Sequence, residues 1–176
     1  MTYEEISRYF ANITDQAAIK NVGNFESTMW GNEKISNYFL VNVNDNFKIN
    51  FQEDFDKSGA SQSFGFRLIY LSKPVDFRAG GPFIGNEVKK IVYVFASRDS
   101  QLSACTIEQV AEPTMKSVAH TSSIQFDKNG NGIMEIEFAK DEIGNFKKCH
   151  EISHVSLQDF LTNIENEISA NTLVIS

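Results

Sequence analysis

Residues 38–51, YFLVNVNDNFKINF, alternate apolar and polar side chains with a period of two. The apolar positions share one face of an extended chain: Phe39, Val41, Val43, Phe47, Ile49 and Phe51. The polar positions between them share the other face: Asn42, Asn44, Lys48 and Asn50. An Asn-Asp turn divides the stretch, and a period of two is typical of a strand with one buried and one solvated face. The stretch therefore predicts a β-hairpin, and with it an antiparallel sheet.

Two later segments, FGFRLIYL at 64–71 and IVYVFA at 91–96, are apolar at nearly every position. A strand that is apolar on both sides is normally covered on both sides, so these segments are expected to be central strands. Helices of this chain can cover one side of the sheet. We expect a second copy of the chain to cover the other, which predicts a homodimer.

Residues 124–138, IQFDKNGNGIMEIEF, match the opening of a calcium-binding loop at Asp127, Asn129, Asn131 and Gly132. The twelfth position of such a loop should be a bidentate Glu, and here it is Phe138. The flanking residues alternate like strands, and Asn-Gly is a strong hairpin signal. The stretch therefore predicts a second hairpin in preference to a calcium site.

Three segments have the apolar spacing of helices. Each opens with a Ser or Thr followed three residues later by an acidic or amide residue, which is the capping-box pattern: Thr2 with Glu5, Thr106 with Gln109, and Ser156 with Asp159. Pro113 falls inside the middle segment and is expected to kink or split that helix.

These elements predict one globular α+β domain over residues 1–176. It should contain a largely antiparallel sheet of five to seven strands, with an N-terminal, a middle and a C-terminal helix packed on one face. This order of elements is similar to that of the small acidic chaperones of type III secretion systems. The resemblance implies a dimeric protein that binds partner polypeptides.

The composition limits the partners. The chain has 16 basic and 23 acidic residues, a net charge of −7, which repels a phosphate backbone and argues against nucleic acid. No apolar run approaches the roughly 20 residues of a membrane span, and Glu4 and Glu5 stand where a signal peptide would be basic. Two cysteines, Cys105 and Cys149, are too few for a disulfide framework. We therefore expect a cytoplasmic protein with neither nucleic acid nor membrane as a partner.

A long connection, residues 72–90, SKPVDFRAGGPFIGNEVKK, joins the two predicted central strands. Its glycines do not match a phosphate-binding loop, because the Lys-Ser or Lys-Thr pair that should open a helix is missing. Connections of this length are often functional. The candidate residues for binding a protein or a small apolar ligand are Phe77, Arg78, Phe83 and Ile84. The alternative is a plain packed loop.

The pentapeptide HEISH, residues 150–154, matches the zinc-peptidase signature H-E-x-x-H. In that chemistry His150 and His154 would bind zinc from one helix face, Glu151 would be the base, and His120 could be a third ligand. However, the capping box at Ser156 places the helix start after the pentapeptide, so residues 146–155 are predicted to be a strand. On a strand the histidines share one face and Glu151 takes the other, which excludes the peptidase mechanism but leaves a non-peptidase zinc site open.

The leading interpretation is a non-enzymatic cytoplasmic binding protein without a cofactor. It would act as a homodimer that presents an apolar sheet face or the 72–90 loop to a protein or a small ligand. One alternative is a zinc-dependent hydrolase that uses residues 150–154. Another is a small-molecule pocket lined by Phe and Tyr beneath the sheet.

Overall fold

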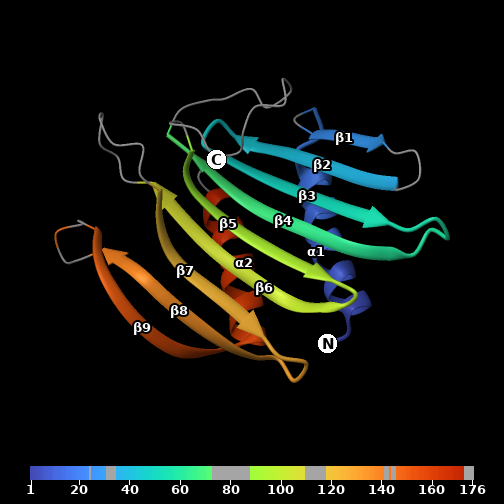
Figure 1. Ribbon diagram of the computed structural model, residues 1–176. Coiled ribbons are helices and arrows are strands. Elements are labelled where there is room, and N and C mark those ends of the chain that lie inside the picture. The colour runs from blue at the N-terminus through green and yellow to red at the C-terminus, as the bar shows by residue number, and fades with distance from the viewer. Residues whose placement is uncertain are drawn as a thin grey trace.

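The computed structural model describes residues 1–23, 25–30, 35–72, 88–109, 118–140, 143 and 146–172. Within these residues the chain forms one nine-stranded antiparallel sheet. One helix precedes the sheet in sequence, α1 (Tyr3–Lys20), and one follows it, α2 (Leu157–Thr172). Figure 1 shows both helices behind the sheet, on the same face.

The strands lie in the sheet in chain order, each paired with the next, as an up-and-down meander (Figure 1). They are β1 (Phe25–Trp30), β2 (Ile35–Asn44), β3 (Phe47–Phe55), β4 (Ser61–Leu71), β5 (Val88–Ser97), β6 (Ser100–Gln109), β7 (Val118–Phe126), β8 (Asn131–Lys140) and β9 (Phe146–Ser156). The opening stretch, 38–51, is the β2–β3 hairpin, as predicted. β1 and β9 are the two edges of the sheet.

The predicted middle helix, and with it the count of five to seven strands, is wrong for the described residues. Thr106 to Gln109 belong to β6, where Ile107 pairs with Ile91 of β5. Leu102 and Ala104 of the same strand are buried, in step with the period of two. The apolar residues that gave the helical spacing belong in part to the end of β6, with Ile107, and in part to the start of β7, with Val118. Pro113 lies between them, outside the described residues. Without this helix, the order of elements that resembled the secretion chaperones is absent from the described chain.

The core lies between the helices and the inner face of the sheet. Its largest fully buried side chains are mostly phenylalanines: Phe10, Phe47, Phe51, Phe64, Phe66 and Phe126. Phe10 of α1 packs on Phe66 and Phe64, with ring centroids 4.8 Å and 5.4 Å away. Phe160 of α2 packs on Phe126 at 5.3 Å. Aromatic pairs therefore attach each helix to the sheet.

The β3–β4 and β7–β8 hairpins close with the same local sequence, Phe-Asp-Lys-x-Gly. In the second, the Asp127 carboxylate accepts the N–H groups of Asn129 (2.8 Å) and Asn131 (3.0 Å), and Gly130 has a φ of +80°. These donors lower the pKa of Asp127. The predicted hairpin is confirmed, because β7 pairs with β8 through Phe126 and Gly132.

The C-terminal helix begins where its cap predicted. The Asp159 N–H donates to the Ser156 hydroxyl at 3.1 Å, and helix α2 starts at Leu157. The Leu157 N–H in turn donates to the Gly130 carbonyl at 2.9 Å, which ties the helix start to the β7–β8 turn. Among the described helices, neither has the length and apolar composition that crossing a membrane requires.

Candidate functional site

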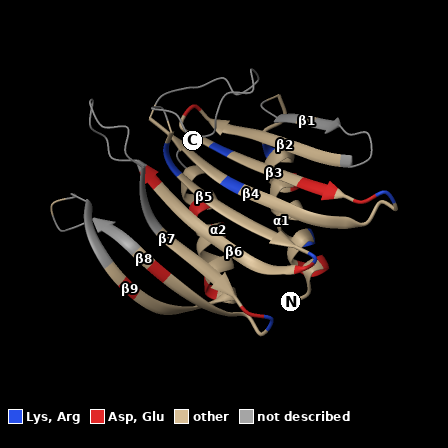
Figure 2. Ribbon diagram, in the orientation of Figure 1, with Lys and Arg blue, Asp and Glu red and all other residues tan. Residues whose placement is uncertain are grey.

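The outer face of the sheet, opposite α1 and α2, carries a groove over β5 to β8. In β5, Val94 is fully buried toward the helices, so its neighbours Tyr93 and Phe95 project outward. Figure 2 shows that the middle of β6 and β7 carries no charged residue. The face most open to a partner is therefore neither strongly acidic nor basic at its centre.

Strand register aligns the outward side chains of β5 to β9 in two rows. One row is Tyr93, Cys105, Ser123, Glu135 and Ile152. The next row is Phe95, Ser103, Gln125, Ile133 and His154. In both rows β5 supplies an aromatic ring and β6 a small side chain. Large side chains therefore lie along β5 and β8, and small side chains lie along β6 between them. The outer face thus has two walls and a floor that run parallel to the strands.

The resulting groove has a volume of about 700 Å³. Tyr93 and Phe95 form one wall, Ile133 and Glu135 form the other, and the floor between them includes Cys105. Its walls stand on strands three positions apart in the sheet, which at strand spacing is about 14 Å. A second hollow, of about 690 Å³, shares Gln125 and Ile133 and continues toward His154. Ile133 therefore lies between the groove and the second hollow and lines both.

Tyr93 is held in place by its neighbours on β4 and β5. A Cβ at Gly65 would lie only 3.3 Å from the Tyr93 ring, so the glycine lets the ring lie against the sheet. The Arg67 guanidinium stacks over the same ring, 4.5 Å from its centroid, and the Phe95 ring lies 6.3 Å away. These contacts fix the aromatic wall before anything binds.

Several apolar side chains of this face remain exposed to solvent. Phe95 is 36% exposed, Ile133 55% and Ile152 62%. Their neighbours in the rows are polar or small, so the apolar groups are arranged as separate contact points around the groove. Phe95 and Ile133 are therefore apolar groups that a molecule in the groove would contact.

The groove lining includes a cysteine, Cys105. Cys105 is a free thiol, and burial raises its pKa, which keeps it protonated and poorly reactive. His150 of β9 contacts the wall residue Glu135, with Nε2 2.9 Å from Oε1.

The segment HEISH lies within β9, so the predicted strand is confirmed. His150 and His154 project from the outer face, whereas Glu151 alternates to the inner face. Four residues of strand separate the two histidines by about 13 Å, too far for both to bind one metal ion. Among the described side chains of this chain, no three His, Cys, Asp or Glu groups gather as metal ligands. His120 lies in β7, and its side chain is outside the described part of the structure.

The candidate residues Phe77, Arg78, Phe83 and Ile84 fall in 73–87, outside the described residues. The strands that flank this segment carry a second, smaller apolar cluster of buried residues: Ile69, Leu71, Val88 and Ile91. This cluster lies on the outer face, because Ile69 and Ile91 are in step with Arg67 and Tyr93. The apolar character of both sides of the central strands is thus real, as their sequence indicated.

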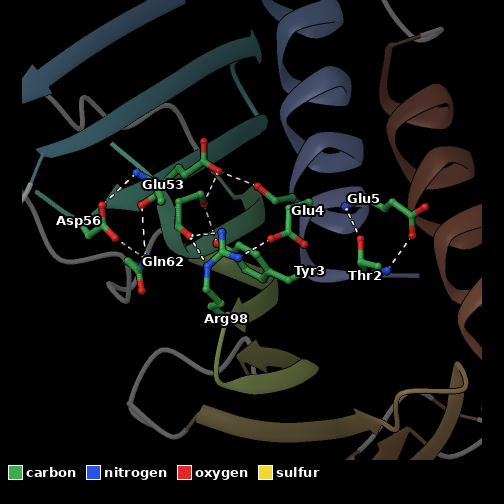
Figure 3. A network of polar contacts seen from close by, with 11 residues as sticks. Thr2, Tyr3, Glu4, Glu5, Glu53, Asp56, Gln62 and Arg98 are labelled. Atoms are coloured by element: carbon green, nitrogen blue, oxygen red, sulfur yellow. Dashed lines mark hydrogen bonds and ion pairs between the residues drawn. The ribbon is translucent and has the colours of Figure 1, made fainter. Parts of the chain in front are cut away.

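A separate polar network joins the start of α1 to the sheet (Figure 3). The Glu53 carboxylate accepts hydrogen bonds from the Ser7 hydroxyl at 2.6 Å and the Ser61 hydroxyl at 2.7 Å. Arg98 donates to the Ser61 carbonyl and pairs with Glu4 of the first helical turn. Because each group has a partner within the network, we assign it an anchoring role for α1.

No protein-family model, curated protein or solved structure matches this chain at a significant level. The fold and the groove therefore define the protein by themselves. Its described residues form a nine-stranded meander whose inner face is covered by α1 and α2 and whose outer face carries an open groove.

Proposed function

We propose that this protein is a non-enzymatic binding protein that accepts an apolar segment of a protein partner in the groove between β5 and β8. The observation that carries the proposal is the set of exposed apolar side chains around this groove, Phe95 and Ile133 above all, on the face that the two helices leave uncovered. Tyr93 and Phe95 give the aromatic anchor typical of binding sites.

An amphipathic helix is the occupant that fits best. A helix with its side chains is about 10–12 Å across, which suits walls about 14 Å apart. An extended peptide would bind through backbone hydrogen bonds, and the face of a sheet offers none. Glu135 on the β8 wall, in a chain of net charge −7, favours a basic residue beside the apolar stripe of the partner.

A cytoplasmic location is part of the proposal. Cys105 is a free thiol on the outer face, beside the groove, and its reduced state is maintained in a reducing compartment.

Selection of helical peptides from a displayed library, on wild-type protein and on Ile133→Asp, tests the proposal. We expect wild type to enrich sequences with apolar residues at i, i+3, i+4 and i+7 and flanking basic residues. Ile133→Asp should lose this enrichment, because it places a charge on the apolar wall. Ile19→Asp, at a residue of α1 that is 72% exposed, is the matched control and should behave as wild type.

The proposal fails if wild type enriches no amphipathic pattern, or if Ile133→Asp enriches the same peptides equally well. Urea unfolding of both variants shows whether each is folded, and a folded Ile133→Asp protein is required for the comparison.

A further inference from the structure

Strand β9 is a long edge strand of eleven residues, and among the described strands it pairs only with β8. Figure 1 shows it at the border of the sheet, beside β8. An edge strand presents a row of unpaired backbone groups that can accept another strand. β1, at the opposite edge, has six residues. The larger surface for pairing therefore belongs to β9.

The hydrogen-bond pattern shows which residues of β9 face outward along the edge. The Leu157 N–H donates to the Gly130 carbonyl, and antiparallel pairs alternate between bonded and non-bonded from there. Ser153, opposite Met134, is then in a bonded pair with β8. Ile152 and His154, at the non-bonded positions, direct their N–H and C=O groups away from β8.

These same residues have exposed side chains on the outer face. Ile152 is 62% exposed, and His150 and His154 flank it two residues to either side. If two copies pair antiparallel about Ile152, each Ile152 faces its own counterpart. His150 then lies opposite the partner's His154. By the two-fold symmetry, His154 lies opposite the partner's His150. Two equivalent histidine pairs result.

Two other registers, centred on Glu151 and on His150, are less favourable. A two-fold axis at Glu151 would set two carboxylates directly opposite each other, which is destabilising in a sheet. A two-fold axis at His150 would place Ile152 opposite Lys148 of the partner and leave it without an apolar contact. The register about Ile152 joins two exposed apolar side chains and opposes no like charges.

We propose that two copies of the chain pair through β9 about Ile152, and that the seam binds a divalent metal ion of the zinc class at two equivalent sites. Each site takes His150 from one copy and the partner's His154. Residues directly opposite in an antiparallel pair have Cβ atoms about 4.5–5.5 Å apart, which allows two imidazoles to reach one ion at about 2.0–2.1 Å. The sites are incomplete in one chain, where the same two histidines are about 13 Å apart.

Glu135 acts as a positioning residue for His150. Its carboxylate lies 2.9 Å from Nε2, which leaves Nδ1 for the metal. Metal-binding histidines commonly hold a carboxylate on their second nitrogen, since this fixes the ring and raises its basicity. Imidazole ligands with open remaining positions suit Zn²⁺, Ni²⁺ or Cu²⁺ better than Mg²⁺ or Ca²⁺. This inference rests on the β9 edge and shares only Glu135 with the groove lining.

Sedimentation equilibrium of the full chain, with Zn²⁺ or with a chelator, tests the proposal. At free Zn²⁺ about ten times the site dissociation constant, each site strengthens dimerisation by about tenfold, so two sites give about a hundredfold. His150→Ala and His154→Ala should each abolish this response, because every site in either homodimer then keeps a single histidine. An equimolar mixture of the two variants should regain about tenfold, because the mixed dimer contains one intact pair and one empty pair.

The recovery in the mixture is the sharpest readout, because a structural role of either histidine cannot produce it. Ile152→Asp should prevent dimerisation with or without Zn²⁺, and Ile19→Asp is the surface control. The proposal is overturned if wild type stays monomeric when Zn²⁺ is bound, or if it dimerises equally with the chelator. It is also overturned if the mixture shows no recovery while both variants are folded by circular dichroism. The selection of peptides on wild type and Ile133→Asp is a separate measurement. The groove proposal and the β9 proposal can therefore be refuted independently.

Discussion

Replacement of Phe10 by alanine tests whether α1 is an integral part of the core. Phe10 is fully buried, and its ring lies 4.8 Å from that of Phe66 and 5.4 Å from that of Phe64. Truncation of a buried Phe to Ala costs about 3–5 kcal/mol of unfolding free energy. Since three ring contacts are lost, those with Phe64, Phe66 and Tyr9, each worth about 0.5–1.5 kcal/mol beyond area burial, we expect a value near the upper end of that range.

Urea unfolding followed by circular dichroism measures this loss. At a typical slope of about 2 kcal/mol per molar urea, the midpoint should fall by about 2 M. Ile19→Ala is the matched control, because Ile19 belongs to the same helix and is 72% exposed. It should change the free energy of unfolding by less than about 0.5 kcal/mol. A loss below about 2 kcal/mol for Phe10→Ala would refute the close packing of α1 on β4.

Three further outcomes are expected. Gly132→Ala should cost about 1–3 kcal/mol in the same titration, because a Cβ there would lie 2.6 Å from the Phe126 ring; an unchanged midpoint would contradict this crowding. Ser156→Ala removes the cap of α2 and should cost about 1 kcal/mol, with Ser156→Asp close to wild type. Burial, and then the hydrogen bond to Glu167, raise the pKa of Tyr70. The resulting stabilisation is complete below about pH 10 and is lost as pH rises further. Tyr70→Phe should therefore destabilise less at high pH than at neutral pH, as alkaline unfolding of the two proteins will show.

Local signals predicted the hairpins and the two terminal helices well. A period of two together with Asn-Asp or Asn-Gly turns depends on neighbouring residues, and so does a capping box followed by helical spacing. The strand conformation of HEISH could be predicted for the same reason. The cap at Ser156 separates strand from helix within a few residues.

The middle helix shows the limit of such signals. Thr106 and Gln109 match a capping box, but four residues of pattern cannot distinguish a helix start from a strand that contains the same letters. Leu102 and Ala104 are buried in the core cluster that also includes residues of α1 and α2, and this tertiary packing favours the strand. One overlooked signal was available, the repeated Phe-Asp-Lys-x-Gly at 55–59 and 126–130, which marks two equivalent hairpin loops.

The groove could not be predicted from the chain, because its walls depend on the register of three successive strand pairs. A shift of one residue in any of them would move Tyr93 or Ile133 out of the rows. Nothing in the local sequence of β6 or β7 indicates that its small residues will lie beneath aromatic neighbours.

The groove and the β9 edge are adjacent but rest on different physical properties of the sheet. The groove uses side chains that stand on one face, and its β8 wall is Ile133 and Glu135. The seam uses backbone groups in the plane of the sheet, together with His150, Ile152 and the partner's His154. A substitution at Ile133 leaves the edge hydrogen bonds intact, whereas one at Ile152 leaves the groove lining intact. HEISH is therefore uninformative as a helical zinc motif, but on an edge strand it places two imidazoles where a second copy can complete the site.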